Sequence, residues 1–292
     1  MKLSCPYCVN PNPSLSISRT IYLQGRYWRK SDGRFISRFS CLKCKKGFSK
    51  ATSHPCFSQN KRHKNQLVRK LLSAGNSQRE TARILNLNRK TVVRKLLFWA
   101  KIAEEKLSLA PRMCQEVQFD DLETFEHTKC KPLSVTLVVE ARTRRILDFE
   151  VAKMPAKGKL AVIARKKYGK RPDERAKFRE VLFERVKKHI HPQAIIRSDS
   201  NPHYPNPVKR HFPMATHHTV MGARGCLTGQ GELKKLKWDP LFSLNHTCAM
   251  LRANINRLIR QTWCTTKRPD RLKAHILLYT LNHNERVFQK LA

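Results

Sequence analysis

Residues 133–140, Leu-Ser-Val-Thr-Leu-Val-Val-Glu, carry the strongest β-strand pattern in the chain, and they decide its fold class. Apolar and β-branched side chains fill this run, as is typical of strands. Arg-Thr-Arg at 142–144 predicts a turn, and residues 146–151, Ile-Leu-Asp-Phe-Glu-Val, predict a partner strand that returns beside the first. The two stretches therefore predict a β-sheet in the C-terminal part of the chain.

The segments on either side extend this sheet. Residues 117–121, Val-Gln-Phe-Asp-Asp, predict a short apolar strand that ends in acidic residues, and residues 194–199, Ala-Ile-Ile-Arg-Ser-Asp, predict a buried strand that ends in a carboxylate. A charged amphipathic helix, a shorter strand and a long basic helix are expected at about 173–189, 216–220 and 244–261. This order of strands and helices predicts an α/β domain with a mixed sheet over residues 111–292.

Four cysteines in the N-terminal part of the chain have the spacing of a metal site. Cys5 and Cys8 form one C-x-x-C pair, and Cys41 and Cys44 form another. Two intervening residues let both thiolates of a pair bind one tetrahedral ion, and two pairs complete a four-sulfur Zn²⁺ site. The stretch between the pairs alternates strand-like pieces with a turn, which predicts a hairpin. Residues 1–60 are therefore predicted to form a zinc ribbon.

The other cysteines carry weaker signals. His54 and Cys56 lie close to the second pair and are an alternative source of one zinc ligand. The remaining cysteines show no metal spacing and are expected to be ordinary buried thiols. They are Cys114, Cys130, Cys226, Cys248 and Cys264.

Residues 61–110 predict three helices. Gly75-Asn76 ends the first, Ser77 caps the second with Glu80 three residues later, and the third begins at Arg89 after a tight turn. Two short helices joined by such a turn, the second of them basic at its start, are typical of a helix-turn-helix. The alternative is an ordinary helical hairpin. The side chains expected to contact DNA are Arg89, Lys90, Arg94 and Lys95.

Charge narrows the classes of function. The 292 residues hold 60 Lys and Arg against 21 Asp and Glu, a formal net charge of +39 that is spread along the whole chain. Self-repulsion on this scale disfavours a free enzyme of small metabolites and favours a polyanionic partner. No long apolar run and no apolar leader are present, so we expect no membrane span and no secretory signal. Since nucleic acids are the obvious intracellular polyanions, we expect a nucleic acid as the partner of this chain.

Two aspartates stand where predicted strands end. Asp120 and Asp199 are 79 residues apart, but the ends of strands in one mixed sheet can lie side by side. Paired carboxylates repel each other unless a cation lies between them. Mg²⁺ or Mn²⁺ held by such a pair can stabilise both oxygens in a phosphoryl displacement. The alternative is that each aspartate only caps a turn, as most such residues do.

The order of these motifs resembles that of bacterial insertion-sequence transposases of the DDE class. The paired cysteines with Lys-Lys-Gly-Phe-Ser at 45–49, then the helix-turn-helix, resemble the N-terminal half of those proteins. Gln-Phe-Asp-Asp-Leu at 118–122 resembles the first-aspartate motif, and Ser198-Asp199 followed by Tyr204 resembles the second. The resemblance implies an RNase H-like, retroviral-integrase-like catalytic domain. It also implies metal-dependent cleavage of element ends and strand transfer into target DNA.

The third acidic position of the family is not matched. The resemblance implies a basic residue seven positions after the third acid, and aligning the last helix on Arg252 places Asn245 there. An amide oxygen can still coordinate Mg²⁺ but carries no charge. Glu232 is the alternative third ligand, and a copy that has lost its activity is a further alternative. On the same helix, Arg252, Arg257 and Arg260 are expected to contact phosphate.

The sequence therefore predicts a DNA transposase. Its expected partners are double-stranded DNA, both the terminal repeats of the element and the target, and further copies of itself. We expect a cytoplasmic, nucleoid-associated bacterial protein with Zn²⁺ and Mg²⁺ (or Mn²⁺) as its metals. Two other functions stay open: a catalytically inactive zinc-containing DNA-binding regulator, and a nuclease of the same fold without strand transfer.

Overall fold

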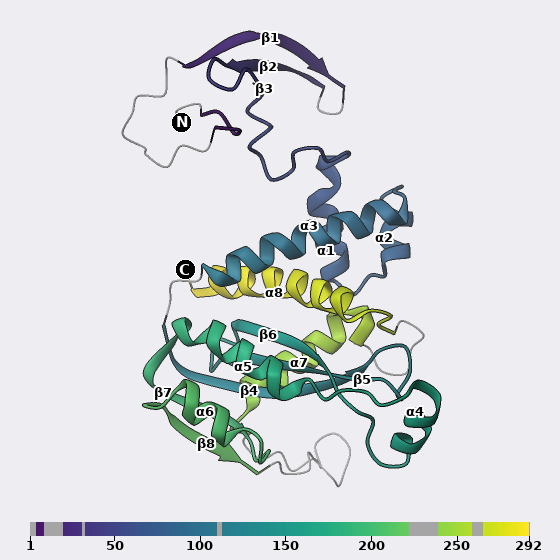
Figure 1. Ribbon diagram of the computed structural model, residues 1–292, viewed down its shortest axis with the longest axis vertical. Helices are drawn as coiled ribbons and strands as arrows, with labels where there is room; N and C mark the ends of the chain where they lie inside the picture. The colour runs from purple at the N-terminus through teal and green to yellow at the C-terminus, as the bar shows by residue number, and fades with distance from the viewer. Residues whose placement is uncertain are drawn as a thin grey trace. The chain divides into compact units, whose positions relative to one another are not determined.

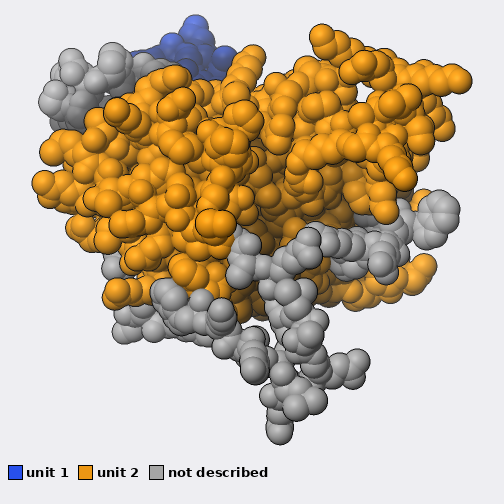
Figure 2. Space-filling model, turned by 90° about the horizontal axis from the view of Figure 1, so that it is seen from below, with its two compact units in different colours: residues 1–66 blue, residues 67–292 orange. Residues whose placement is uncertain are grey.

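The structure of the chain, a computed structural model, describes residues 4–8, 20–30, 33–109, 113–221, 239–258 and 265–291. It divides into two compact units, residues 1–66 and residues 67–292, which Figure 2 colours separately. Each unit is described by itself. Among the helices of the described residues, none is long and apolar enough to cross a membrane.

The first unit is a small antiparallel sheet beside the four cysteines. Strand β1 (Ile21–Arg29) pairs with β2 (Arg34–Cys41), and β2 pairs with β3 (Gly47–Phe48). A core of buried Cys5, Cys41 and Phe48 lies at one end of the sheet. The predicted hairpin between the two cysteine pairs is confirmed.

Three helices lie at the start of the second unit: α1 (Asn65–Ser73), whose first two residues still belong to the first unit, α2 (Gln78–Ile84) and α3 (Arg89–Ser108). The Ser77 hydroxyl accepts a hydrogen bond from the backbone N–H of Glu80 at 3.1 Å, so it caps α2 as predicted. The Asn88 side chain caps α3 in the same way, through the N–H of Lys90 at 2.8 Å. The predicted helices and the turn between α2 and α3 are therefore confirmed.

A five-stranded mixed sheet forms the rest of the second unit, in the order β6-β5-β4-β7-β8. The strands β4, β5 and β6 are antiparallel neighbours, whereas β7 and β8 run parallel to β4. The predicted α/β class with a mixed sheet is confirmed. The five strands are β4 (Cys114–Phe125), β5 (Pro132–Glu140), β6 (Ile146–Lys153), β7 (Ile190–Asp199) and β8 (Thr216–Val220).

Helices cover both faces of this sheet (Figure 1). On one face, α5 and α6 bury Phe119, Phe183 and Tyr204 in one apolar cluster. On the other face, α7 and α8 share a second cluster with Leu122 of β4 and Leu96 of α3. The helices after the first three are α4 (Leu160–Tyr168), α5 (Arg175–Val186), α6 (Pro205–His211), α7 (Phe242–Asn254) and α8 (Pro269–Leu291), with 3₁₀ turns at Lys187–His189 and Asn256–Leu258. A further 3₁₀ turn, Arg62–Lys64, precedes α1.

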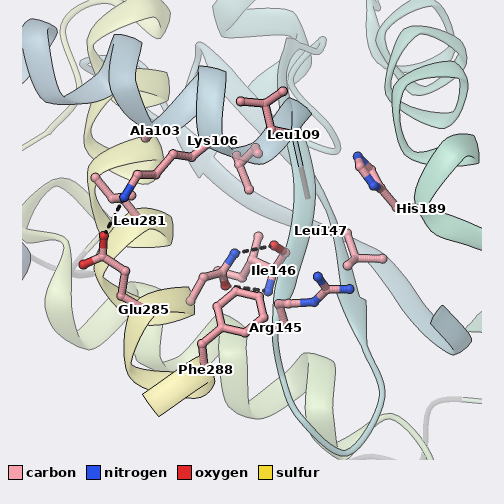
Figure 3. A pocket seen from close by; sticks show the side chains of 12 residues that line it. Ala103, Lys106, Leu109, Arg145, Ile146, Leu147, His189, Leu281, Glu285 and Phe288 are labelled. Atoms are coloured by element: carbon pink, nitrogen blue, oxygen red, sulfur yellow. Dashed lines mark hydrogen bonds and ion pairs between the residues drawn. The ribbon is translucent and has the colours of Figure 1, made fainter. Parts of the chain in front are cut away.

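Helix α8 joins the three N-terminal helices to the sheet, since it lies between α3 and β6 (Figure 1). Asn284 of α8 accepts from the N–H of Ile146 at 3.0 Å and donates to its carbonyl oxygen at 2.8 Å, which covers part of the β6 edge. A largely apolar cavity of about 280 Å³ lies beside this contact, with Leu107, Leu281 and Phe288 in its lining (Figure 3). The chain thus stays in one compact unit across the boundary predicted at residue 110.

Two predictions about element bounds are wrong. The helix predicted to reach residue 261 ends at Asn254 and is followed by a 3₁₀ turn, and residues 259–261 lie outside the described part. The sequence also predicts that Pro192 ends the helix expected at about 173–189, but Pro192 lies inside β7, where the register against β4 shifts between Ile190 and Ile195. A proline is tolerated at such an irregularity because no ladder hydrogen bond needs its missing N–H.

The contact between α2 and α8 predicts a dependence of stability on pH. His275 of α8 is buried and shares a hydrogen bond of 3.1 Å with the Gln78 side chain. Burial lowers the pKa of His275 to about 3, so the folded chain holds it neutral while the unfolded chain protonates it below about pH 6.5. Stability is therefore expected to fall as the pH drops from 6.5 towards 3, by up to about 1.4 kcal/mol per pH unit from this residue.

Urea denaturation of the native chain and of His275→Gln at pH 7, 6, 5 and 4 measures this effect. Glutamine keeps a hydrogen-bonding partner for Gln78 but does not titrate. The variant is expected to lose less stability on acidification than the native chain. Equal losses in both proteins would show that His275 does not set this pH dependence.

Candidate functional site

The sheet brings the two predicted catalytic aspartates to adjacent parallel strands. In the parallel register of β4 with β7, Gln118 pairs with Arg197, so a step of two residues along each strand places Asp120 beside Asp199. Neighbouring strands lie about 4.8 Å apart. Asp120 is not at the end of its own strand, as had been expected, because β4 continues to Phe125 in its pairing with β5. Asp120 lies at the level where β7 ends and its pairing with β4 stops.

Both carboxylates lie on the face of the sheet that α7 covers. Side chains alternate between the two faces of a strand. Phe119 and Asp121 therefore point towards α5, while Gln118 and Asp120 point the other way. The Gln118 amide donates to the carbonyl oxygen of Pro240 and accepts from the N–H of Leu244, both at 3.0 Å. These two bonds fix the start of α7 over the strand that carries Asp120.

The environment of Asp120 disfavours its charged form. Burial raises the pKa of Asp120 to about 6, and the negative charge of Asp199 raises it further, while the N–H of Asp121 and the Tyr204 hydroxyl oppose the shift. Neither Asp120 nor Asp199 makes an ion pair with a described residue, although the chain carries 60 Lys and Arg. A carboxylate pair without a protein cation is the arrangement that a divalent ion stabilises.

Asp121, adjacent in sequence, has a different role. Its carboxylate accepts from Thr136 and pairs with the buried Arg179 of α5 at 3.2 Å. The Arg179 guanidinium also lies 4.6 Å from the centre of the Tyr204 ring, and the Tyr204 hydroxyl donates to Oδ1 of Asp120 at 3.1 Å. Asp121 therefore orients Arg179 and Tyr204, and through them Asp120.

The side chain of the predicted third ligand, Asn245, bonds to a residue other than the two aspartates. Asn245 lies on α7 but is exposed, and its amide donates to Asp239 at 2.8 Å. Cys248, one turn later, does lie near Asp120: burial raises the pKa of this thiol to about 12, and the charge of Asp120 adds to that shift. Helix α7 therefore passes near Asp120 at Cys248, while the Asn245 amide bonds to Asp239. Glu232, the other candidate, lies outside the described residues.

Histidines near these motifs do not join the carboxylates. His217 of β8 bonds to the Ser198 hydroxyl at 2.9 Å and stacks on Phe119, on the opposite face of the sheet. His246 contacts Arg144 at 3.0 Å. Both histidines have a pKa lowered by burial. Within the described ranges, no third His, Cys, Asp or Glu groups with Asp120 and Asp199 as a metal site.

The four N-terminal cysteines form a second site, and here all ligands come together. The sulfur atoms of Cys5, Cys8, Cys41 and Cys44 all lie within 4.8 Å of one another. Cys5 Sγ lies 3.6 Å from Cys44 Sγ, and Cys8 Sγ lies 3.7 Å from Cys41 Sγ. A tetrahedron with Zn–S bonds of about 2.3 Å has edges of about 3.8 Å. The arrangement therefore fits one zinc ion, and the separations are too long for disulfide bonds.

Local backbone geometry supports a thiolate in this cluster. Hydrogen bonds from the backbone N–H groups of Cys44 and Lys43 lower the pKa of Cys41 to about 7, whereas hydrogen bonds with the Cys44 and Cys41 side chains raise the pKa of Cys8 to about 12. The alternative ligands lie apart from the cluster: Cys56 accepts from Asn65 at 3.3 Å, and His54 Nδ1 accepts from the N–H of Cys56. The four-cysteine set is the one the structure supports.

The predicted DNA-contacting residues of α3 divide into two groups. Arg89, Lys90 and Arg94 are exposed, as expected, but Lys95 is only 3 % exposed. The prediction for Lys95 is wrong, because it lies one turn after Val92 and shares the buried side of the helix. A side chain in that position cannot reach DNA.

The predicted basic face of the last helix is also revised. Arg252 lies on α7, but Arg257 lies in the following 3₁₀ turn and donates to the carbonyl oxygen of Thr265 at 3.4 Å. Arg260 lies outside the described residues. Helix α7 ends at Asn254, too early for Arg252 and Arg257 to share one helical side.

Tyr204, Arg179 and Gln118 are the residues of the site to which the sequence assigned no role. Tyr204 and Gln118 belong to the two aspartate motifs. The motifs identify these residues but do not predict their contacts. Arg179 carried no signal, since a basic residue on a charged helix is usually exposed. Compared with known proteins, the chain matches no family model and no curated protein.

Proposed function

We propose that this protein is a DDE-type DNA transposase that uses Asp120 and Asp199 to hold Mg²⁺ at a scissile phosphodiester. The observation that carries the proposal is the placement of these two carboxylates side by side, on one face of adjacent parallel strands, without an ion pair to any described residue. In a chain with a net charge of +39, two neighbouring carboxylates without an ion pair to any described residue need an explanation. A bound divalent cation supplies one.

The order of strands supports the RNase H-like part of the proposal. Three antiparallel strands are followed by two that run parallel to the first of them, with β4 at the centre between β5 and β7. The resemblance to transposases implies this arrangement, with the first two acids on the two central parallel strands. The four-cysteine cluster and the α2–turn–α3 segment stand before it in the expected order.

Each residue of the site has a part in the proposed reaction. Asp120 and Asp199 would bind Mg²⁺, which when bound polarises the phosphodiester and lowers the pKa of water or of a 3′-hydroxyl. Burial raises the pKa of Tyr204 above its usual range, so its hydroxyl keeps its proton and can hold the Asp120 carboxylate in one orientation. Gln118 holds α7, and with it Asn245, over the same face.

A DNA cleavage assay tests the proposed function. The full chain is incubated with labelled DNA that carries the sequences flanking its own gene, together with an unlabelled target duplex. With Mg²⁺ or Mn²⁺ we expect cleavage at the element ends and joined products, and with EDTA neither. Cleavage without joined products, even when the donor already has a free 3′-hydroxyl, would identify a nuclease instead.

One observation favours a second function, that of a non-catalytic DNA-binding regulator. Asn245 carries no charge, and its amide bonds to Asp239 and not to the aspartate pair. A regulator of this kind would bind duplex DNA with zinc in place, and its behaviour would not change with Mg²⁺. The same assay separates it from a transposase, since it would give no cleavage under any metal.

Both functions require α3 to bind duplex DNA. Replacing Arg89, Lys90 and Arg94 together with Ala is expected to weaken duplex binding and its dependence on salt. Each lost phosphate contact lowers the slope of log K against log salt by about 0.9. Titrations at several salt concentrations measure this slope. Lys101→Ala is the matched control, since Lys101 is an exposed basic residue later on the same helix; an equal effect there would contradict a specific role for the start of α3.

A further inference from the structure

The β1–β2 hairpin exposes several large aromatic side chains. Trp28 is 56 % exposed, Phe35 68 % and Tyr27 43 %. The core of this unit, by contrast, lies at the cysteine end of the hairpin, around Cys41 and Phe48. Exposed aromatic rings gathered in one place are unusual on a protein surface and mark a binding site.

The strand register places the rings on defined faces. Trp28 pairs directly with Phe35 across the two strands, and their rings meet edge to face with centres 5.1 Å apart. Directly paired residues share a face, so Arg26, two positions before Trp28, lies on this face too. Tyr27 pairs with Ile36 on the opposite face. The described residues next to the turn therefore carry the Trp28–Phe35 ring pair on one face and Tyr27 on the other.

Positive charge accompanies the rings. Residues 1–66 contain 14 Lys and Arg and a single acidic residue, Asp32. No acidic residue lies in β1 or β2. The basic residues of the hairpin, Arg26, Arg29, Lys30, Arg34 and Arg38, alternate with its aromatic residues.

We propose that the tip of the β1–β2 hairpin, centred on Trp28 and Phe35, binds unpaired nucleobases of single-stranded DNA. The rings provide flat apolar faces on which bases stack, and the neighbouring arginines provide positive charge for the phosphates between them. In a paired duplex the bases are already stacked, so their faces are not accessible to these rings. The hairpin and α3 would thus bind different forms of DNA.

Other occupants fit the surface less well. A purely apolar protein partner would have to bury the charged arginines of the hairpin, at a cost in desolvation. An anionic membrane would satisfy both rings and arginines, but the high positive charge of the second unit, with its exposed basic α3, fits nucleic acid. This proposal does not depend on the catalytic one. It requires only that the hairpin is folded, so a protein without nuclease activity can still bind single strands.

Fluorescence and affinity measurements on the full zinc-loaded chain test the proposal. The probes are an oligo(dT) of about 20 nucleotides and a duplex of the same length, at one fixed salt concentration. In the native chain, oligo(dT) is expected to quench the fluorescence of Trp28. In Trp28→Phe this quenching is lost, but the affinity for oligo(dT) stays within about threefold, because Phe still stacks.

The double variant Trp28→Ala/Phe35→Ala is expected to bind oligo(dT) about 10- to 100-fold more weakly and the duplex less than about threefold more weakly. Its zinc content is expected to equal that of the native chain, since neither ring contacts the cysteines. The proposal is overturned if oligo(dT) does not quench Trp28, or if affinities for single strand and duplex fall together. Displacement of oligo(dT) by phosphatidylserine vesicles, or a change of oligomeric state in the double variant, would overturn it too, in favour of a membrane or a self-association surface.

Discussion

Replacing Asp120 or Asp199 with Asn is expected to lower Mg²⁺-dependent DNA cleavage by at least about a thousandfold, while binding of duplex DNA stays within about threefold of the native chain. A bound metal supplies several kcal/mol of transition-state stabilisation, and a thousandfold loss corresponds to about 4 kcal/mol. Asn keeps the size of the side chain but removes the charge that holds the cation. Gel-based cleavage assays with labelled ends, beside filter-binding titrations of the same DNA, measure both quantities.

The control for this prediction is Glu123→Gln on the same strand. Glu123 is exposed and pairs with Lys157 at 2.6 Å, so its loss is expected to leave cleavage unchanged. Folding provides a second control. Burial raises the pKa of Asp120 to about 6, so above that pH the ionised side chain destabilises the metal-free fold. We therefore expect Asp120→Asn to unfold no more easily than the native chain at pH 8. Full cleavage by an Asp120→Asn/Asp199→Asn double variant would contradict the proposal that these two carboxylates hold the catalytic metal.

Sequence patterns predicted the sheet and the neighbouring aspartates because both follow from local rules. An alternating or continuous apolar run predicts a strand wherever it occurs. The runs at β4, β5, β6 and β7 are long enough to stand out from the basic background. Once those four strands pair, the register alone brings Asp120 beside Asp199.

The contacts that surround this pair could not be read from the sequence, because they depend on how distant elements pack. The pairing of Asp121 with Arg179 requires that α5 crosses β4 at one point, and nothing in either segment specifies it. Lys95 is a different case. Its position three residues after Val92 and four before Trp99 places it on the buried side, so helical periodicity was sufficient to exclude it from the DNA-contacting set.

The third ligand shows where local rules end. Counting back seven positions from Arg252 predicts Asn245 as the third ligand, and Asn245 does lie on a helix, α7, where its side chain is exposed. For the Asn245 side-chain oxygen to coordinate a metal, the amide would first have to break its hydrogen bond to Asp239. A helix position can be read from a pattern, but the rotamer of a polar side chain is decided by the partners present.

Replacing Cys8 and Cys44 together with Ser is expected to abolish zinc binding and to unfold the β1–β2–β3 sheet. Among the described residues, the buried core of this unit is Cys5, Cys41 and Phe48, with Ile21 and Phe39 partly buried against it, so we expect folding to depend on the metal. Structural zinc sites contribute apparent binding free energies of about 10–16 kcal/mol, far more than such a core can supply. Metal analysis is expected to give one zinc per native chain and none in the variant.

Cys56→Ser is the matched control, because Cys56 bonds to Asn65 and lies apart from the four sulfurs. It is expected to keep one zinc per chain and the native hairpin. In the Cys8→Ser/Cys44→Ser variant, amide hydrogen exchange is expected to lose protection in β1 and β2 but to keep it in β4 and β5, since these strands belong to the other compact unit and have their own core. Protection that survives in β1 and β2 without zinc would mean that the hairpin folds by itself, and that the four cysteines lie together for a reason other than a structural metal.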